Sequence, residues 1–183
     1  SSNDSRMKAV MYHYVRPKPS RPPYEYYYLD LDDFRRQLTV LAESYDLIDR
    51  ETFLSYVQSG ETPPDDAAIL TFDDGLRDHH EWVLPELRER DLWGLFFVPG
   101  PPVDRLLPVH RIHSMLGTAR AKDLARSLRS ILREMDDVTD DMDDYGPAYT
   151  KNEFTASSRW FKRTLNYVVP YGRLPAVFDE LHR

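Results

Sequence analysis

A six-residue apolar run, Ala67–Phe72 (AAILTF), is the feature that most constrains the fold of this chain. Apolar and polar residues do not alternate in it, and such a run is typical of a strand that is buried on both faces of a parallel sheet. Leu92–Val98 (LWGLFFV) is a second run of this kind, and we predict that it is also a fully buried strand. Because parallel strands are joined by long crossover connections that are usually helical, the two runs predict βαβ units.

Strand and helix patterns alternate around these two runs. The strand patterns cover 8–15 and 45–48, and the helix patterns cover 30–45, 51–58 and 81–90. In the first helix pattern Leu31, Phe34 and Leu38 recur at steps of three and four residues, which places them on one helix face. The alternation predicts an α/β fold with a parallel sheet or a barrel.

The pattern changes at Pro108, after which only helices are predicted. They cover 109–116, 122–135, 157–168 and 173–183. An acidic segment, Asp136–Asp144 (DDVTDDMDD), separates the second and third of them and is most simply a solvated loop.

Length and charge exclude several classes of protein. A chain of 183 residues is long enough for one sizeable core, so one domain is the default expectation. The net charge of −7, from 24 basic and 31 acidic residues, repels a phosphate backbone unless a basic face is strongly segregated. We see no such stripe and expect no nucleic-acid partner. The absence of cysteine excludes disulfides and thiolate metal sites.

The apolar segments of the chain are too short for a membrane span, since the longest are strand-sized. Residues 1–6 are polar and lead into a short apolar run without the longer apolar region of a secretory signal. We therefore expect a cytoplasmic protein without a membrane span.

The strongest chemical feature follows the first buried strand, where the chain reads Asp73-Asp74-Gly75. Ligands collect at the carboxyl ends of the strands in α/β folds, so two carboxylates here are placed for chemistry. One could bind a divalent metal while the other takes a proton from an attacking water. The alternative is that both aspartates are turn residues, because Asp-Gly turns are common.

Histidines occur at three further places of interest. His13 lies near the end of the first predicted strand, which is the same structural position as that of the aspartate pair; a lone histidine in a strand is more often a core residue than a catalyst. His79 and His80 are most simply capping or surface residues. His110 and His113 have helical spacing and could be metal ligands, although this spacing is frequent by chance.

Serine-nucleophile and nucleotide chemistry have little support in this sequence. No GxSxG nucleophile elbow occurs, and the seven glycines form no phosphate-binding loop.

Four segments together resemble a known family. Their order and spacing (8–15, KAVMYHYV; 29–41, LDLDDFRRQLTVL; 68–75, AILTFDDG; 92–99, LWGLFFVP) are similar to those of the polysaccharide deacetylases of the NodB-homology type, carbohydrate esterase family 4. The resemblance covers residues 8–100. It implies a distorted (β/α) barrel that removes N-acetyl groups from an N-acetylated carbohydrate with a divalent metal, usually zinc.

The resemblance also implies roles for three residues. Asp73 would be the general base that activates water, Asp74 would be a metal ligand, and His13 would lie close to the substrate. The family completes its metal site with two histidines four residues apart, and no such pair occurs in this sequence. We do not assign the ligand role to His110 and His113, whose spacing is three.

The expected organisation is a single NodB-like domain over 1–183. Residues 8–100 would supply barrel strands and helices, and residues 104–183 a helical insertion after the third or fourth strand, with the barrel incomplete at the C-terminus. A catalytically incomplete half-barrel that binds glycan or a partner chain is the alternative. A deacylase acting on a small cyclic amide or another non-sugar is a third possibility, and the oligomeric state stays open.

Overall fold

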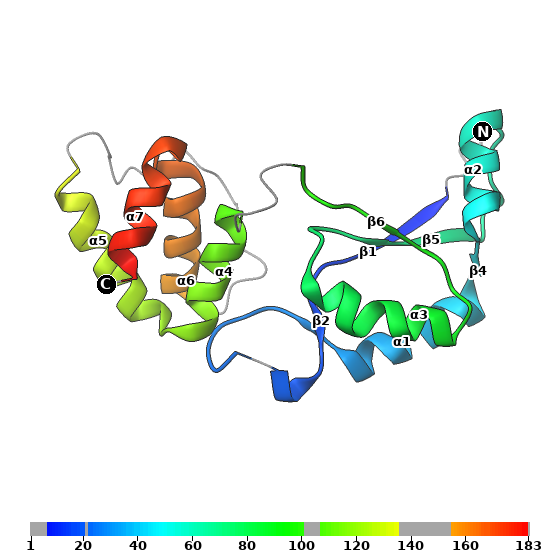
Figure 1. Ribbon diagram of the computed structural model, residues 1–183, viewed down its shortest axis with the longest axis horizontal. Helices are drawn as coiled ribbons and strands as arrows, with labels where there is room; N and C mark the ends of the chain where they lie inside the picture. The colour runs from blue at the N-terminus through cyan, green and yellow to red at the C-terminus, as the bar shows by residue number, and fades with distance from the viewer. Residues whose placement is uncertain (1–6, 21, 101–106, 136–154, 183) are drawn as a thin grey trace. The chain divides into compact units, whose positions relative to one another are not determined.

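The computed structural model describes residues 7–20, 22–100, 107–135 and 155–182 of the chain. The chain forms two compact units (Figure 1). The sheet unit comprises 1–21 and 27–103, and the helical unit comprises 22–26 and 104–183. The predicted loop at 136–144 lies outside the described residues.

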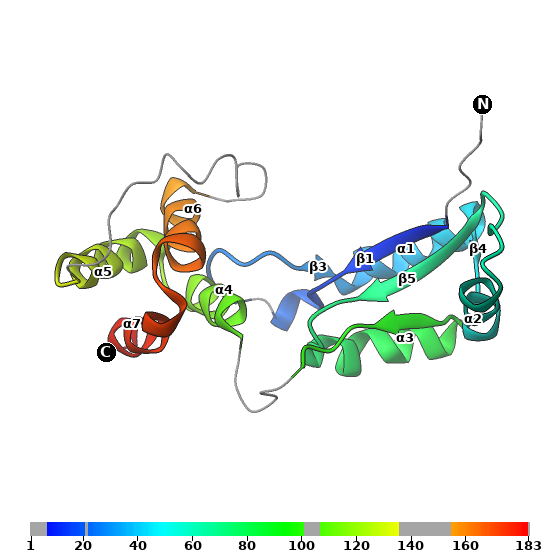
Figure 2. The ribbon, with the colours of Figure 1, turned by 90° about the horizontal axis from the view of Figure 1, so that it is seen from above.

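A parallel sheet forms the centre of the sheet unit, with β5 (Ala67–Phe72) in its middle. The strand β1 (Lys8–Tyr12) pairs with one edge of β5 along its length. The other edge pairs first with β4 (Asp46–Leu47) and then with β6 (Gly94–Phe96). The near-parallel course of β1, β5 and β6 is visible in Figure 2. A second small parallel sheet joins β2 (Val15–Arg16) to β3 (Leu29–Asp30).

Each longer helix of the sheet unit begins at an aspartate cap. Asp30 accepts a hydrogen bond from the Asp32 amide at the start of α1 (Leu31–Ser44), and Asp49 accepts one from the Thr52 amide at the start of α2 (Arg50–Ser59). Such caps satisfy amides that have no partner within the helix. The remaining helices are the 3₁₀ turn η1 (Lys18–Ser20), the π-helix η2 (His79–Val83) and α3 (Leu84–Glu89).

The alternating side chains of β5 enter two different cores. Leu70 and Phe72 lie on one face and pack with Phe34 and Leu38 of α1 and with Leu87 of α3. Ile69 lies on the opposite face, in a smaller cluster. Its other members are Ile48, Ala67, Met7, Phe53, Tyr56 and Trp93. Every residue of β5 is buried, as the continuous apolar run predicts.

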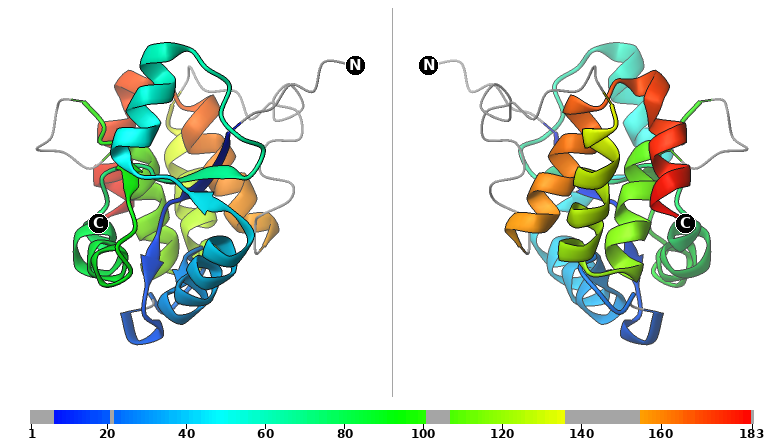
Figure 3. Two further views of the ribbon diagram at one scale, coloured as in Figure 1. Left: turned by 90° about the vertical axis from the view of Figure 1, so that its right-hand side faces the viewer. Right: turned by 90° about the vertical axis from the view of Figure 1, so that its left-hand side faces the viewer.

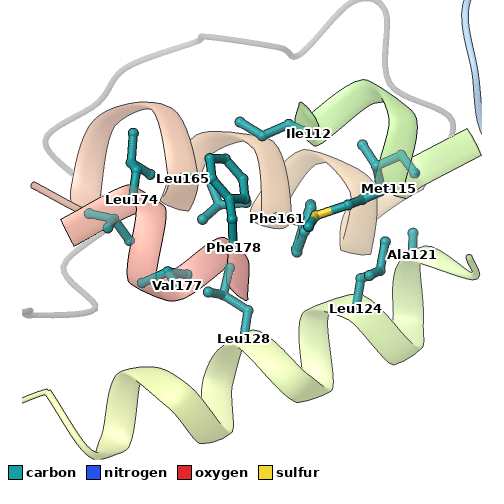
Figure 4. Packing of buried hydrophobic residues seen from close by; sticks show 12 residues of the cluster. Ile112, Met115, Ala121, Leu124, Leu128, Phe161, Leu165, Leu174, Val177 and Phe178 are labelled. Atoms are coloured by element: carbon teal, nitrogen blue, oxygen red, sulfur yellow. The ribbon is translucent and has the colours of Figure 1, made fainter. Parts of the chain in front are cut away.

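The helical unit contains only helices among its described residues. They are α4 (Pro108–Thr118), α5 (Ala121–Arg133), α6 (Ala156–Arg163) with the π-helix η4 (Thr164–Val168), and the 3₁₀ turn η5 (Tyr171–Arg173) with α7 (Leu174–Leu181). Figure 3 shows these helices side by side. Their apolar faces meet in one core centred on Leu128, Phe161 and Phe178 (Figure 4).

The prediction of an α/β fold with a parallel sheet is confirmed, with differences in individual elements. The predicted strand 8–15 is interrupted at His13 and Tyr14, because β2 leaves the main sheet to pair with β3. The predicted helix 81–90 begins earlier, within η2. That residues 1–183 form one NodB-like domain stays a prediction.

The prediction that 92–98 is a fully buried strand is wrong. Only Gly94–Phe96 form β6, and Phe97 and Val98 are exposed, with fractions of 52% and 67%. Among the described residues β6 pairs only with β5, so its other edge has no strand beside it. No helix in the described part of the chain is long and apolar enough to cross a membrane.

Candidate functional site

The candidate site begins where β5 ends. The Asp73 amide donates a hydrogen bond to the Tyr12 carbonyl at 3.0 Å, so the pairing of β5 with β1 continues one residue beyond the strand. The chain then turns through left-handed backbone conformations at Asp74 (φ 77°) and Gly75 (φ 57°). Aspartate is one of the few residues with a side chain that tolerates this region, at a cost of about 1 kcal/mol. A local conformation of this kind marks a position where a functional role is worth testing.

Space for a side chain at Gly75 is tight, in addition to its left-handed conformation. A Cβ atom at this position would lie 3.1 Å from Cγ1 of Val98, which is closer than most Cβ contacts. The turn after β5 therefore packs closely against the segment that follows β6.

The register of β1 and β5 brings His13 to the same end of the sheet as the two aspartates. Tyr12 lies opposite Phe72, so His13 and Asp73 both follow the last paired residues of adjacent parallel strands. Nε2 of His13 lies 3.8 Å from Oδ2 of Asp74, and both side chains are partly exposed. This is an ion pair whenever His13 is protonated. The structure thus brings the three predicted site residues to one end of the sheet, while their roles stay predictions.

His79 belongs to this region, and its predicted place at the surface or in a cap is wrong. Its side chain is buried, and its Nε2 lies 2.9 Å from the carbonyl oxygen of His13. As a hydrogen-bond donor to that carbonyl, Nε2 carries the proton and Nδ1 is left as an acceptor. Nδ1 is also buried and has no hydrogen-bond partner among the described residues. The neighbouring His80 is exposed, as predicted.

Aromatic rings surround the buried imidazole of His79. The ring of Phe72 lies 5.6 Å away and that of Phe96 5.8 Å away, between centroids. Burial lowers the pKa of His79, and the hydrogen bond to His13 opposes this only in part. His79 is therefore a neutral residue that fixes the backbone at His13. Its position five residues after Asp74, on the first turn after the Gly75 turn, was the only sequence signal for this role.

An ion pair between Arg16 and Asp78 fixes the residue that precedes His79. Nε and Nη2 of Arg16, on β2, donate to the two carboxylate oxygens of Asp78 at 2.9 Å each. Both side chains are largely buried, and this two-pronged geometry is the strongest form of an arginine–carboxylate contact. The contact holds the residue before His79 against β2, and β2 directly follows His13 and Tyr14.

The described residues do not provide a complete zinc site. Zinc in catalytic sites usually has three protein ligands, and no group of three histidine, aspartate or glutamate side chains is close enough together in the described ranges. Asp74 and His13 form a pair only. His110 and His113 lie on α4 with ring centroids 6.4 Å apart, and His113 also contacts the ring of Tyr26.

Comparison with known proteins finds similar structures and no sequence match. No protein-family model matches the chain, and no curated protein sequence does either. The similar solved structures include a de-N-acetylase from Aggregatibacter actinomycetemcomitans, with 20% identity and a TM-score of 0.45 over 56% of this chain and 42% of that one. IcaB from Ammonifex degensii has 21% identity and a TM-score of 0.43 over 69% of this chain and 52% of that one.

A third structure is the Streptococcus pyogenes deacetylase PplD in complex with acetate. It is 19% identical with a TM-score of 0.40 and covers 88% of this chain and 81% of that one. The chain thus spans about half the length of the first two structures. All three TM-scores lie below 0.5.

Proposed function

We propose that the chain is part of a carbohydrate N-deacetylase, a hydrolase that removes N-acetyl groups from an amino sugar or polysaccharide. One observation carries the proposal: Asp73 and Asp74 follow a fully buried parallel strand, with His13 beside Asp74 at the end of the adjacent strand. An Asp-Gly turn accounts for the left-handed backbone at Asp74, but not for the imidazole of His13 that lies beside it after the adjacent strand.

In the proposed reaction water attacks the carbonyl carbon of the acetamido group. Asp73 takes a proton from that water, so that a better nucleophile forms as the new C–O bond is made. The C–N bond then breaks, the sugar nitrogen leaves as an amine after gaining a proton, and acetate is released. His13 would contact the substrate beside the reacting group.

Metal dependence is part of the proposal, with Asp74 as one ligand and zinc as the expected ion. A bound zinc would polarise the acetyl carbonyl. The described residues contain no group of three ligands, so the remaining ligands must come from outside them and no step of the reaction is derived through the metal. We also propose that the sheet belongs to a distorted (β/α) barrel into which residues 104–183 are inserted.

Acetate release from an N-acetylglucosamine oligomer in the presence of zinc tests the proposed activity. We expect release by the protein and a decrease of about a hundredfold or more for Asp73→Asn, the range expected when a general base is lost. Asp66→Asn is the matched control, because Asp66 is exposed and precedes β5 at its opposite end. The control should keep the original rate within about twofold.

Two outcomes would contradict the proposal. If the protein with its zinc ligands complete releases no acetate, or if Asp73→Asn is as active as Asp66→Asn, Asp73 is not the base of a deacetylase. Binding of the oligomer without acetate release would instead support the half-barrel that binds glycan. Equilibrium dialysis with zinc tests Asp74 separately: Asp74→Asn should bind zinc about tenfold more weakly than Asp66→Asn, and equal binding would remove Asp74 from the metal site.

A further inference from the structure

A stripe of cations runs along the outer face of α5, and no part of the proposed reaction uses it. It consists of Lys122, Arg126, Arg129 and Arg133, which we call the α5 stripe. Successive members are four, three and four residues apart, so they lie on one face of the helix over about 16 Å. All four are exposed, whereas Leu124 and Leu128 point into the core.

Within the described part of the chain, two of the four stripe residues have a partner. The helix α5 contains four basic residues and one acidic residue, Asp123, and Glu134 follows it directly. Asp123 pairs with Arg126 at 3.1 Å, and Arg129 stacks over the ring of Trp160 at 4.1 Å. Neither Lys122 nor Arg133 has an ionic partner in the ranges that the structure describes. The helix α5 thus carries a short basic stripe, which the composition of the whole chain does not predict.

We propose that the α5 stripe binds an anionic glycan, a sugar chain that carries carboxylate or phosphate groups. The inference rests on the proposed function, which gives the chain a carbohydrate substrate, and it adds the charge class of that substrate. Guanidinium groups recognise both carboxylate and phosphate in a two-pronged geometry. A row of cations along a helix suits an extended polymer with regularly spaced anions rather than a single small ion.

Two other polyanions fit the stripe less well. Single-stranded nucleic acid is normally bound through bases that stack on aromatic rings. Among the described residues, the aromatic ring of Trp160 lies next to the stripe, and Arg129 covers it. A helix that lies in a membrane surface inserts its apolar face into the lipid, but the apolar face of α5 is buried in the core of the helical unit. Both remain outcomes of the test.

Binding of the full chain to four polyanions at about 50 mM salt tests the proposal, because screening is weak there. The probes are polygalacturonate, phosphorylated dextran, single-stranded DNA and phosphatidylglycerol vesicles, with an N-acetylglucosamine oligomer as the neutral reference. The variant K122Q/R126Q/R133Q removes three cations and keeps the Arg129–Trp160 contact. The matched control, R36Q/R50Q/R88Q, removes three exposed cations of the sheet unit.

We expect one or both anionic glycans to bind, with affinity lowered about tenfold or more in the α5 variant and within about twofold in the control. The two glycan arms distinguish carboxylate from phosphate. The proposal is overturned if neither glycan binds, if both triple variants weaken binding equally, or if only DNA or vesicles depend on the stripe. Since this assay does not depend on Asp73, a failure of deacetylation with stripe-dependent binding intact would remove the proposed function alone.

Discussion

In the sheet unit most of the described arginines pair with carboxylates, whereas α5 of the helical unit has one such pair, Arg126 with Asp123, and presents its other cations outward. The pairs of the sheet unit include Arg16 with Asp78, Arg35 with Glu86 and with Asp32, Arg36 with Asp33, and Arg77 with Glu81. Two of them join elements distant in sequence: β2 to the residue before η2, and α1 to α3. Charge in the sheet unit thus fixes the architecture around the candidate site, whereas Lys122 and Arg133 of α5 have no ionic partner in the described ranges.

The two units also differ in what their cores position. The core of the sheet unit lies between β5 and its helices and holds the strand ends that carry Asp73 and His13. The core of the helical unit joins four helices and presents the face of α5. Because each core consists of residues from its own unit, we expect a core substitution to destabilise mainly the unit that contains it.

The largest expected effect on stability comes from truncating one large buried side chain in each core. Phe34 and Phe178 are almost fully buried, one in each unit. We expect Phe34→Ala and Phe178→Ala each to lower the free energy of unfolding of its own unit by about 3–5 kcal/mol, from lost burial and the cavity left behind. Hydrogen exchange measures this: Phe34→Ala should reduce the protection of β5 amides and spare those of α5. Equal loss of protection in both units from either variant would show that they unfold together.

A smaller effect is expected where the sheet unit has no room for a methyl group. A Cβ atom on Gly94 would lie 2.6 Å from Cε2 of Phe72. Gly94→Ala should therefore lower the free energy of unfolding by about 2–3 kcal/mol, because the ring or the strand must shift.

Gly172 of the helical unit is the control for this substitution, since a Cβ there has no atom within 4 Å. Gly172→Ala should change the free energy of unfolding by less than about 1 kcal/mol. Denaturant titration measures both values. A neutral Gly94→Ala would mean that β6 does not pack against Phe72 in solution.

Loss of the Arg16–Asp78 ion pair is expected to lower the free energy of unfolding by less than either phenylalanine substitution. Asp78→Asn keeps the size of the side chain and removes its charge, so one largely buried guanidinium loses its counter-ion. We expect the free energy of unfolding to fall by about 2 kcal/mol, a value discounted for the partial exposure of both groups. The exposed pair of Arg36 with Asp33 is the reference, and Asp33→Asn should cost about 0.5 kcal/mol or less. Equal costs for the two variants would contradict the role of Arg16 in holding the site segment.

The smallest expected effect is the pH dependence contributed by His79. Its pKa is lowered in the folded protein by burial, so the unfolded chain takes up a proton more readily. The contribution is complete above the pKa of an unfolded histidine, about 6.5, and is lost as the pH falls toward the lower folded value. Between pH 7 and pH 5 the free energy of unfolding should fall more in the original protein than in His79→Gln.

His80→Gln is the matched control for this pH dependence, since His80 is the exposed neighbour. It should keep the pH dependence of the original protein. An identical slope in His79→Gln and the original protein would show that His79 is accessible to protons in the folded state.

The strand at the centre of the sheet could be predicted to the residue. Five of the six residues of Ala67–Phe72 are apolar, and the hydroxyl of buried Thr71 donates to the Val10 carbonyl, so pattern and burial coincide. Asp73, Asp74 and His13 could be placed at one end of the sheet for the same reason, because adjacent parallel strands end at the same edge. The spacing of the four cations of the α5 stripe, by three and four residues, is also present in the sequence. The acidic net charge of the whole chain gives no indication of it.

The rest of the site could not be read from the sequence. In the sequence His79 resembles a polar residue at the start of a helix. In the structure it is buried beside the rings of Phe72 and Phe96 and is hydrogen-bonded to the His13 carbonyl. Leu92–Val98 has the same apolar character as β5, yet Phe97 and Val98 are exposed. An apolar run shows that a segment can be buried and does not show how many neighbours it has.

The sequence by itself determined most of the segments that become strands and helices, and where along them the carboxylates and cations fall. These properties depend on neighbours within a few residues, through the periodicity of strands and helices. The tertiary structure decided which charges are compensated and which histidine is neutral, since Arg16 and Asp78 lie 62 positions apart and His13 and His79 lie 66 apart. Desolvation and ion pairing depend on what surrounds a group in space, and that is fixed only when distant segments pack together.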